Sequence, residues 1–388
     1  MYNMRGMKKA KRLNSVKEYY FSGKLREVSR MINSGKPVIN MGIGSPDIEP
    51  NPKVLKALTD AMSHPKAHMY QSYQGLPELR KTISNFYEKY YGVKLNPDSE
   101  VLPLMGSKEG IMHLSMAFLN PGDEVLIPNP GYPTYSSIAG LMEAKTIFYH
   151  LKSSKNWQPD FEFLEHLNTS KVKIMWLNYP HMPTGTDISI ETFDKLILWA
   201  RQREILLIND NPYSFILTDK PQSILSRPNA KEVAVELNSL SKSFNMAGWR
   251  VGMMSGNEKV LAQALKVKSN MDSGMFFGIQ QGAIKALNST PDWFYELNKV
   301  YKKRRDLMKN LIKKLGVKIE KEGVGLFLWA KLPEGLNNSE AFIDKILKEK
   351  NIFITPGTVF GSQGEGYIRF SLCVSEEKIK EAIKRFES

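Results

Sequence analysis

The sequence predicts an α/β protein in which helices cover a mostly parallel sheet, together with a second, smaller α+β domain. Short runs rich in Val, Ile and Leu recur between helix-like segments, which is the pattern of strands buried on both faces. The chain has 388 residues, enough for more than one packed core. No internal repeat or Ser/Gly-rich linker divides it. We therefore expect two domains that are interleaved along the chain.

The strands of the sheet are expected where apolar runs are bounded by Asn, Pro, Gly or Asp. These runs cover residues 124–127, 173–177, 205–208, 233–235 and 251–254. A further strand over 101–104 precedes a helix over 109–119. The segment 191–203 has apolar residues at helical spacing and ends in basic residues, which favours a helix crossing between parallel strands.

The character of the sequence changes after about residue 285. A long charged helix is expected from about 293 to 315, followed by extended segments at 317–320 and 326–331, a helix near 339–348 and a strand at 367–372. This alternation of helix and strand predicts the smaller α+β domain.

Composition and charge bear on the partners and the location of the protein. The formal net charge of +14 could indicate nucleic acid. The lysines are, however, spread over segments such as 302–314 and 345–350 between apolar and acidic residues, which favours a solvated face. Cys373 is the only cysteine, so neither an intrachain disulfide nor a thiolate metal cluster is possible. Without a signal-like or membrane-spanning apolar segment, we expect a cytoplasmic protein that binds no metal, membrane or nucleic acid.

The most informative residue is Lys242, in the run Asn238-Ser-Leu-Ser-Lys-Ser-Phe-Asn-Met-Ala-Gly-Trp-Arg-Val-Gly252. A lysine that attacks a carbonyl must be deprotonated, which burial or a neighbouring cation favours. Ser239, Ser241 and Arg250 can donate hydrogen bonds to a phosphate dianion beside it. Ser-x-Ser-Lys alone also occurs at ordinary helix starts, but the Gly-x-Arg-x-Gly tail favours a cofactor site.

With these residues, the run resembles the pyridoxal 5′-phosphate (PLP) attachment site of class I/II aminotransferases of fold type I. The resemblance covers about residues 20–386, with the motifs in the family's order. It implies a large PLP-binding domain over 46–285 with a seven-stranded sheet, and a small domain built from 1–45 and 286–388. It also implies ping-pong transfer of an amino group from an L-amino acid to a 2-oxo acid through an aldimine of Lys242.

Further residues match cofactor-binding positions of the family. Gly106, Ser107 and Lys108 open a helix whose N-terminal amides can cradle a phosphate, although Gly-Ser before a helix is also a common cap. Tyr132 matches the aromatic ring that stacks on the pyridine, and it also suits a bare turn. Asp210 follows a buried strand and matches the carboxylate that keeps the pyridine nitrogen protonated.

The remaining matches concern the ring oxygen O3′, the substrate and a second subunit. Tyr213 matches a hydroxyl donor to O3′. Arg369 matches the arginine that binds the substrate's α-carboxylate as a bidentate pair, and Gly44 matches the glycine beside that carboxylate. Tyr70 matches a tyrosine that reaches the phosphate of the neighbouring subunit, so the resemblance implies a homodimer.

One position departs from the family pattern Asn-x-Pro-x-Asn-Pro-Thr-Gly. Here the run reads Asn178-Tyr-Pro-His-Met-Pro-Thr-Gly185, with Met182 in place of the asparagine that hydrogen-bonds O3′. A methionine cannot donate a hydrogen bond, so its presence should raise the pKa of the cofactor imine. Our hypothesis is that Tyr213, alone or with Asn178 rotated inward, holds O3′. The alternative is that Met182 only packs, and the enzyme works with one hydrogen bond fewer.

The substrate is not set by these motifs. Segments 73–80, 106–110, 120–123 and 128–133 look most like the branch that holds LL-diaminopimelate and alanine/aspartate-type aminotransferases. No arginine marks a clamp for a side-chain carboxylate. Lys266 and Lys268 are possible, but a solvated helix face is the favoured interpretation.

Two alternatives share this scaffold. A PLP-dependent lyase or ring-forming synthase would use the same Lys242, Asp210 and Arg250, so the cofactor motifs do not exclude it. A PLP-sensing regulator would resemble this chain fused to a winged-helix domain, and the roughly 40 residues before Gly42 are too few for one.

Overall fold

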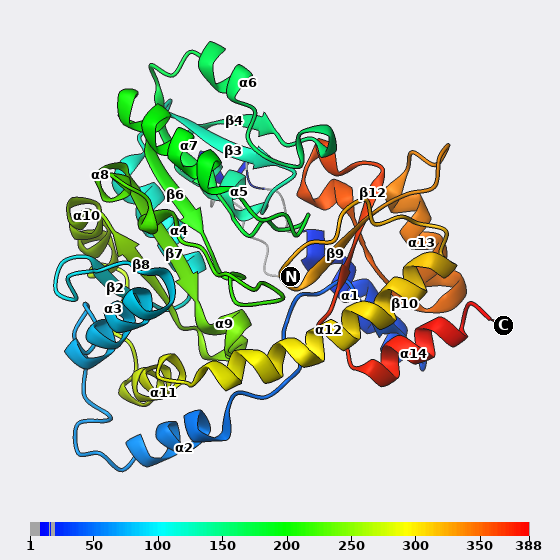
Figure 1. Cartoon of the computed structure of the whole chain (residues 1–388), viewed down its shortest axis with the longest axis horizontal. Helices are drawn as coiled ribbons and strands as arrows, with labels where there is room; N and C mark the ends of the chain where they lie inside the picture. The colour runs from blue at the N-terminus through cyan, green and yellow to red at the C-terminus, as the bar shows by residue number, and fades with distance from the viewer. Residues whose placement is uncertain (1–7, 15, 17–19, 388) are drawn as a thin grey trace.

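The computed structural model describes residues 8–14, 16 and 20–387, and a seven-stranded sheet forms its main body (Figure 1). The strand order is β2-β8-β7-β6-β5-β3-β4. Strand β8 runs antiparallel to both of its neighbours, and the other pairs are parallel. The strands are β2 (Val101–Leu104), β3 (Glu124–Asn129), β4 (Lys145–His150), β5 (Val172–Leu177), β6 (Leu206–Asp210), β7 (Ala234–Ser239) and β8 (Gly252–Gly256). The predicted mostly parallel sheet is therefore confirmed.

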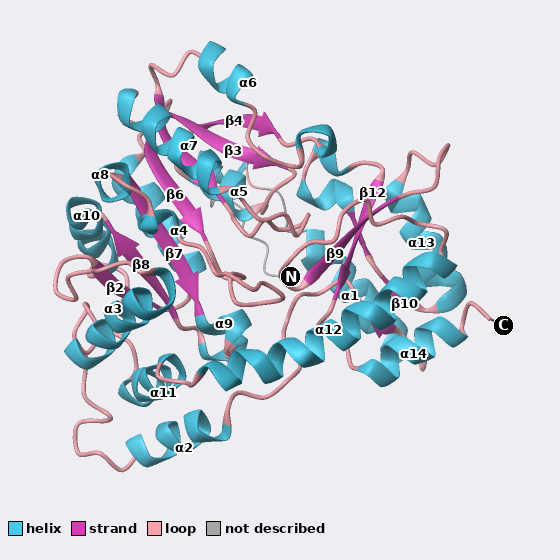
Figure 2. Ribbon diagram, in the orientation of Figure 1, coloured by secondary structure: helices cyan, strands magenta, loops and turns pink. Residues whose placement is uncertain are grey.

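Helices cover both faces of this sheet (Figure 2). One face packs against α4 (Ser107–Phe118), α5 (Thr134–Leu141) and α10 (Glu258–Lys268). The other packs against α3 (Pro77–Tyr91) and α7 (Ile190–Gln202). Neighbouring residues of β6 show the alternation, because Leu207 belongs to the core under α3 and α7, whereas Ile208 belongs to the core under α4. Both faces are buried, which explains the continuous apolar runs in the sequence.

The pattern of apolar runs did not predict β4. This strand lies at the edge of the sheet, paired only with β3, and most of its side chains are partly or fully exposed. An edge strand of this kind needs no continuous apolar run. The extended segment expected at 317–320 is a different case, since it forms only an isolated bridge between Lys318 and Lys331 rather than a strand.

The C-terminal part of the chain builds a second, antiparallel sheet of order β11-β12-β9. Its strands are β9 (Phe327–Lys331), β11 (Thr355–Pro356) and β12 (Tyr367–Ser371), and its helices are α12 (Pro291–Lys314), α13 (Ser339–Lys350) and α14 (Glu376–Lys384). The domain boundaries after residues 45 and 285 stay a prediction.

Residues near the two ends of the chain lie side by side. Strand β1 (Ile39–Asn40), which follows α1 (Tyr20–Asn33), pairs in parallel with β10 (Ile352–Phe353). Arg304 of α12 also binds Asp47 with its guanidinium, 2.6 Å from Oδ1. Two further helices, α2 (Pro52–Ala61) and α11 (Phe277–Leu287), pack together beside the main sheet (Figure 1). Among the described helices, none is long and apolar enough to cross a membrane.

Candidate active site

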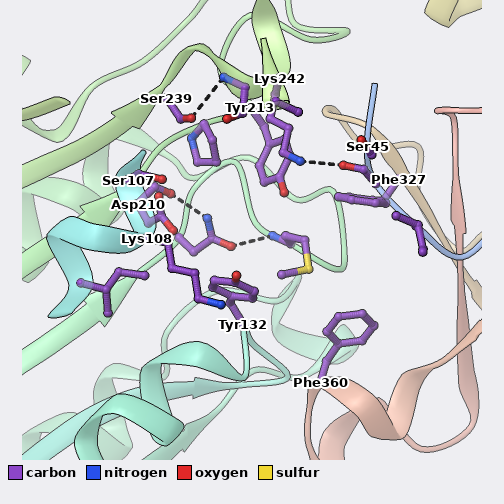
Figure 3. Close-up of a pocket in the computed structure, with 18 of the residues that line it drawn as sticks. Ser45, Ser107, Lys108, Tyr132, Asp210, Tyr213, Ser239, Lys242, Phe327 and Phe360 are labelled. Atoms are coloured by element: carbon purple, nitrogen blue, oxygen red, sulfur yellow. Dashed lines mark hydrogen bonds between the residues drawn. The ribbon is translucent and has the colours of Figure 1, made fainter. Parts of the chain in front are cut away.

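A cavity of about 410 Å³ lies where the main sheet meets the C-terminal elements (Figure 3). Most of the residues singled out from the sequence line it. They are Gly44, Ser107, Lys108, Tyr132, Asn178, Asp210, Tyr213, Ser239, Ser241, Lys242, Arg250 and Arg369.

The parallel strands explain why residues so far apart in sequence meet. Asp210 is the last residue of β6, Ser239 is the last residue of β7, and Asn178 follows β5 directly. The carboxyl ends of parallel strands lie at one edge of a sheet, and the loops that leave them converge there. The cavity therefore opens at the edge where ligands bind in open α/β sheets.

Lys242 reaches the cavity from the short helix α9 (Leu240–Ser243). The hydroxyl of Ser239 caps this helix by accepting from the Ser241 amide at 3.1 Å. The Lys242 amine donates to the Gly44 carbonyl at 2.6 Å. Burial lowers the pKa of Lys242, and the charges of Arg369 and Arg250 lower it further, against the opposing effects of Cys373 and Asp210. This environment favours the neutral, nucleophilic amine.

Asp210 is a buried carboxylate, and only one of its two oxygens accepts a hydrogen bond from a described residue. Its Oδ2 accepts from the Tyr135 hydroxyl at 2.9 Å, and Oδ1 has no hydrogen-bond partner among the described residues. Burial raises the pKa of Asp210 to about 6, although the Tyr135 hydrogen bond and the Lys242 charge oppose this rise. An orphaned carboxylate oxygen in a cavity is costly unless a ligand donates to it.

Sequence reasoning missed Tyr135, which lies three residues after Tyr132 in the same run. Its ring stacks on Trp176, with centroids 4.9 Å apart and planes inclined by 7°, and this holds the hydroxyl against Asp210. Tyr135 stands close to Tyr132 in the sequence, but no motif or spacing links it to the carboxylate of Asp210, 75 positions further on.

Arg250 and the start of α4 form a cradle for an anion. Arg250 has a φ of 56°, a left-handed conformation that is uncommon for a residue with a side chain. Its Nη1 donates to the Ala247 carbonyl at 2.9 Å and lies 3.4 Å from the Ser241 hydroxyl. Gly106 has a φ of 89°, and a Cβ there would stand 2.1 Å from Nη2 of Arg250. Only glycine lets the guanidinium lie against the N-terminus of α4, where amides and arginine can bind a phosphate together.

Arg369 projects from β12 between two aromatic rings. The guanidinium carbon lies 4.0 Å from the centroid of Phe327 and 4.7 Å from that of Phe360. Nη2 donates to the Gly42 carbonyl at 2.5 Å. A Cβ at Gly44 would stand 2.3 Å from the Phe327 ring, so the backbone can pass there only as glycine. Neither phenylalanine was expected, because a single apolar residue in a strand or turn carries no signal of its partner.

The segment 178–182, in which Met182 departs from the family pattern, contributes Asn178 and Met182 to the lining of the cavity. Asn178 donates from Nδ2 to the Asp210 carbonyl at 2.6 Å, and its Oδ1 accepts from the Met182 amide at 3.1 Å (Figure 3). The sulfur of Met182 lies 3.3 Å from Nη1 of Arg369. Burial raises the pKa of Tyr213, so its hydroxyl stays protonated and can donate. The hypothesis that Tyr213 holds O3′ stays a prediction.

Two of the residues that the sequence predicted at the cofactor site, Gly106 and Tyr70, do not line the cavity. Gly106 lies just behind Arg250, as its close approach requires. Tyr70 is 90% exposed and lines a separate surface hollow with Ser273, Gly274 and Phe276.

The interpretation of Lys268 as part of a solvated face is wrong. Lys268 is 0% exposed, and its amine lies 2.8 Å from Oδ2 of Asp272. The two residues lie one helical turn apart, because the Asp272 amide also donates to the Lys268 carbonyl at 3.0 Å. Glu109, His113 and Asp272 bring possible metal-ligand atoms within 4.8 Å of one another. The Lys268 ammonium already occupies the place of a cation beside Asp272. Lys266 is exposed, as expected.

The fold and the cavity define an enzyme of the fold type I class that binds PLP through a lysine. Residues 36–386 match the model of the family described as aminotransferase class I and II, and the chain belongs to this family. It is a PLP-dependent aminotransferase, and its family membership does not favour the lyase, synthase or regulator alternatives.

Relatives and solved structures support this assignment over the whole chain. The chain is 40% identical to an LL-diaminopimelate aminotransferase of Aquifex aeolicus, over 97% of this chain and 98% of the relative. It is 41% identical to an enzyme of the same name from Dehalococcoides mccartyi, over 98% of each chain. The structure of BacF from Bacillus subtilis without ligand superposes with a TM-score of 0.93 at 36% identity, covering 98% of this chain and 97% of that one.

The described residues fit the cofactor. The orphaned Oδ1 of Asp210 offers an acceptor to a protonated ring nitrogen, and the cradle of Arg250 and Gly106 offers donors to a phosphate. The amine of Lys242 lies in the same cavity.

Proposed function

We propose that Lys242, Asp210 and Arg369 carry the amino transfer. When bound, PLP supplies an electron-accepting ring beside the substrate's α-carbon. With PLP and the amino acid bound, the Lys242 amine would take up and return the proton that leaves the substrate's α-carbon. The lowered pKa of Lys242 keeps a larger share of the amine unprotonated, which is the form that can accept a proton. The observation that carries this proposal is that the Lys242 amine, the orphaned Asp210 oxygen and the Arg369 guanidinium share one cavity.

Each of the other cavity residues has a binding role in the proposal. Asp210, held by Tyr135, keeps the ring nitrogen protonated. Arg369 binds the α-carboxylate as a bidentate pair beside Gly44, with its guanidinium plane fixed between two rings. The phosphate is held by a group of donors, and the ring face by one aromatic residue. The phosphate donors are Ser107, Lys108, Ser239, Ser241 and Arg250, and the stacking residue is Tyr132.

We propose LL-diaminopimelate as the first amino donor to test, because full-length relatives at about 40% identity carry that name. A second candidate is an amino acid with an apolar side chain. The described wall of the cavity around Arg369 is largely apolar and includes Leu25, Ile43, Phe327 and Phe360. This wall offers no evident partner for a second ammonium group.

The test is a half-reaction without acceptor, followed by the absorbance of the bound cofactor. LL-diaminopimelate, L-phenylalanine and L-aspartate would each be added to the loaded enzyme, and 2-oxoglutarate would then restore the starting spectrum. A fast half-reaction with one donor identifies the substrate class. Release of ammonia or pyruvate, with the starting spectrum restored before any 2-oxoglutarate is added, would instead point to a lyase. No reaction with any donor would refute the proposal.

We further propose a cytoplasmic homodimer in which Tyr70 completes the neighbouring site. Tyr70 lines a surface hollow with other exposed apolar side chains, since Met69 is 63% and Phe276 is 38% exposed. Gly274 packs so closely on Gln71 that a Cβ would stand 2.4 Å from the Gln71 carbonyl. The two loops therefore form one continuous surface, and an apolar patch of this kind favours an interface.

Mixing two inactive variants tests the shared site. In a hybrid of Tyr70→Phe and Lys242→Ala, the site that keeps Lys242 receives the native Tyr70 from the other chain. Activity recovered after subunit exchange supports the arrangement. If Tyr70 acts within its own chain, the hybrid has no intact site and stays inactive.

A further inference from the structure

A buried carboxylate behind the active site plays no part in the chemistry described above. Glu236 lies on β7, is 0% exposed and is the register partner of Asn209 on β6. Four groups donate to it. Oε1 accepts from the Tyr87 hydroxyl at 3.1 Å and the Ser223 hydroxyl at 2.9 Å, and Oε2 accepts from Asn209 Nδ2 at 3.1 Å and the Ile224 amide at 3.2 Å.

Asn209 connects this carboxylate to the segment that follows β5. Its Oδ1 accepts from the Tyr179 amide at 3.0 Å, and its Nδ2 donates to the Tyr179 carbonyl at 3.3 Å. Because Glu236 offers only acceptors when ionised, it fixes which end of the Asn209 amide is the nitrogen. If the Asn209 amide were flipped, its oxygen would face both the Glu236 carboxylate and the Tyr179 carbonyl oxygen.

The sequence neighbours of the two connected residues, Asp210 and Asn178, line the cavity. Asp210 follows Asn209 directly, and Asn178 precedes Tyr179. The Asn178 amide joins the two, since it donates to the Asp210 carbonyl at 2.6 Å and accepts from the Met182 amide at 3.1 Å. A movement of the Asn209 side chain would therefore shift both segments that carry the ring partner and the residues proposed to lie near O3′.

We propose that Glu236 is a positioning residue that acts through Asn209 to hold Asp210 and the segment 178–182 in register with the cofactor ring. The inference rests on the cofactor site proposed above. Residues behind a ligand-binding group commonly set its orientation in this way. Burial raises the pKa of Glu236 to about 7, against the hydrogen bonds from Asn209 and Ser223. A carboxylate that served only to fill this space could be replaced by an apolar side chain at lower free-energy cost.

The test compares Asn209→Ala, which cuts the connection, with Ser223→Ala, which removes one hydrogen bond on the far side of the same carboxylate. Three quantities are measured: the urea midpoint of the cofactor-free protein, the Kd for PLP, and the absorbance spectrum of bound PLP against pH. We expect Asn209→Ala to raise the Kd about tenfold and to shift the spectral transition. Ser223→Ala should lower the urea midpoint and leave the Kd within about twofold of wild type.

Two variants of Glu236 test the carboxylate itself. Glu236→Gln can turn its amide nitrogen toward the Tyr87 and Ser223 hydroxyls, which can accept, and keep its oxygen toward Asn209. We therefore expect it to retain the wild-type Kd within about twofold. Glu236→Leu should reproduce the effect of Asn209→Ala on the Kd and the spectrum. If this variant fails to fold, the comparison of Asn209→Ala with Ser223→Ala still tests the connection through Asn209.

An unchanged Kd and spectrum in Asn209→Ala would refute the inference. Equal losses of affinity in Asn209→Ala and Ser223→Ala, at equal loss of stability, would also refute it, because a purely structural network predicts that result. Failure of the wild-type protein to bind PLP would refute the cofactor site itself. A wild type that binds PLP, beside an Asn209→Ala variant that binds equally well, would refute only the positioning role.

Discussion

The Asp210→Asn substitution should make the cofactor-free protein more stable and the cofactor site weaker. Burial raises the pKa of Asp210 from 3.8 to about 6. The folded protein therefore binds this proton more tightly than the unfolded chain does, and stability falls as the pH rises between these two values. A rise of about two pH units corresponds to roughly 3 kcal/mol, which the folded protein loses in full above about pH 6. An asparagine carries no charge, so it avoids this loss and can still accept from Tyr135.

The assay is urea unfolding of the cofactor-free wild type and variant at two pH values. At about pH 8 the variant should unfold with a free energy roughly 3 kcal/mol higher, and below about pH 4 the two should agree, because both side chains are then neutral. The effect on cofactor binding should have the opposite sign, so that the more stable variant binds PLP more weakly. Loss of the charged partner of the ring nitrogen should raise the Kd for PLP between about tenfold and a hundredfold.

Asp187→Asn is a suitable control. Burial also raises the pKa of Asp187, but this residue lines a separate hollow beside Trp157 and Gly323. It should gain some stability at high pH and keep its affinity for PLP. Equal unfolding free energies of wild type and Asp210→Asn at high pH would refute the argument from burial. Unchanged affinity for PLP in that variant would refute the role of Asp210.

Three further substitutions test other parts of the site. Arg369→Lys should raise KM for the amino donor about tenfold or more with a smaller change in kcat, because lysine cannot form the bidentate pair; a change in kcat alone would contradict this. Met182→Asn should lower the pH at which the absorbance of bound PLP changes, since it adds a donor near O3′, and an unchanged titration would show that position 182 does not face O3′. Lys268→Met should destabilise the protein by about 3 to 5 kcal/mol, measured by urea unfolding, because it leaves Asp272 buried without its cation; a loss below about 1 kcal/mol would show that the pair contributes little.

Local patterns predicted the main sheet because its strands are buried on both faces. The run at 205–208 corresponds to β6, and the run at 173–177 to β5, within one or two residues. The edge strand β4 and the bridge at Lys318 lie outside this rule, because their pairing depends on neighbours rather than on their own apolar content. Lys268 shows the same limit for charge, because its position on a helix predicted exposure whereas the folded protein buries it beside Asp272.

Many of the residues that line the cavity could be recognised in the sequence because they lie in short runs that match motifs of the family. Lys242 has its serines and Arg250 within a few positions, and Asp210 ends an apolar run. Tertiary structure alone decided what surrounds them. Tyr135 reaches Asp210, two phenylalanines enclose Arg369, and Glu236 connects to the segment 178–182 through Asn209, all across separations that no local pattern records. The physical reason is that a motif specifies the groups that react, whereas their positions and pKa values depend on burial and on contacts formed only when the strands are assembled side by side.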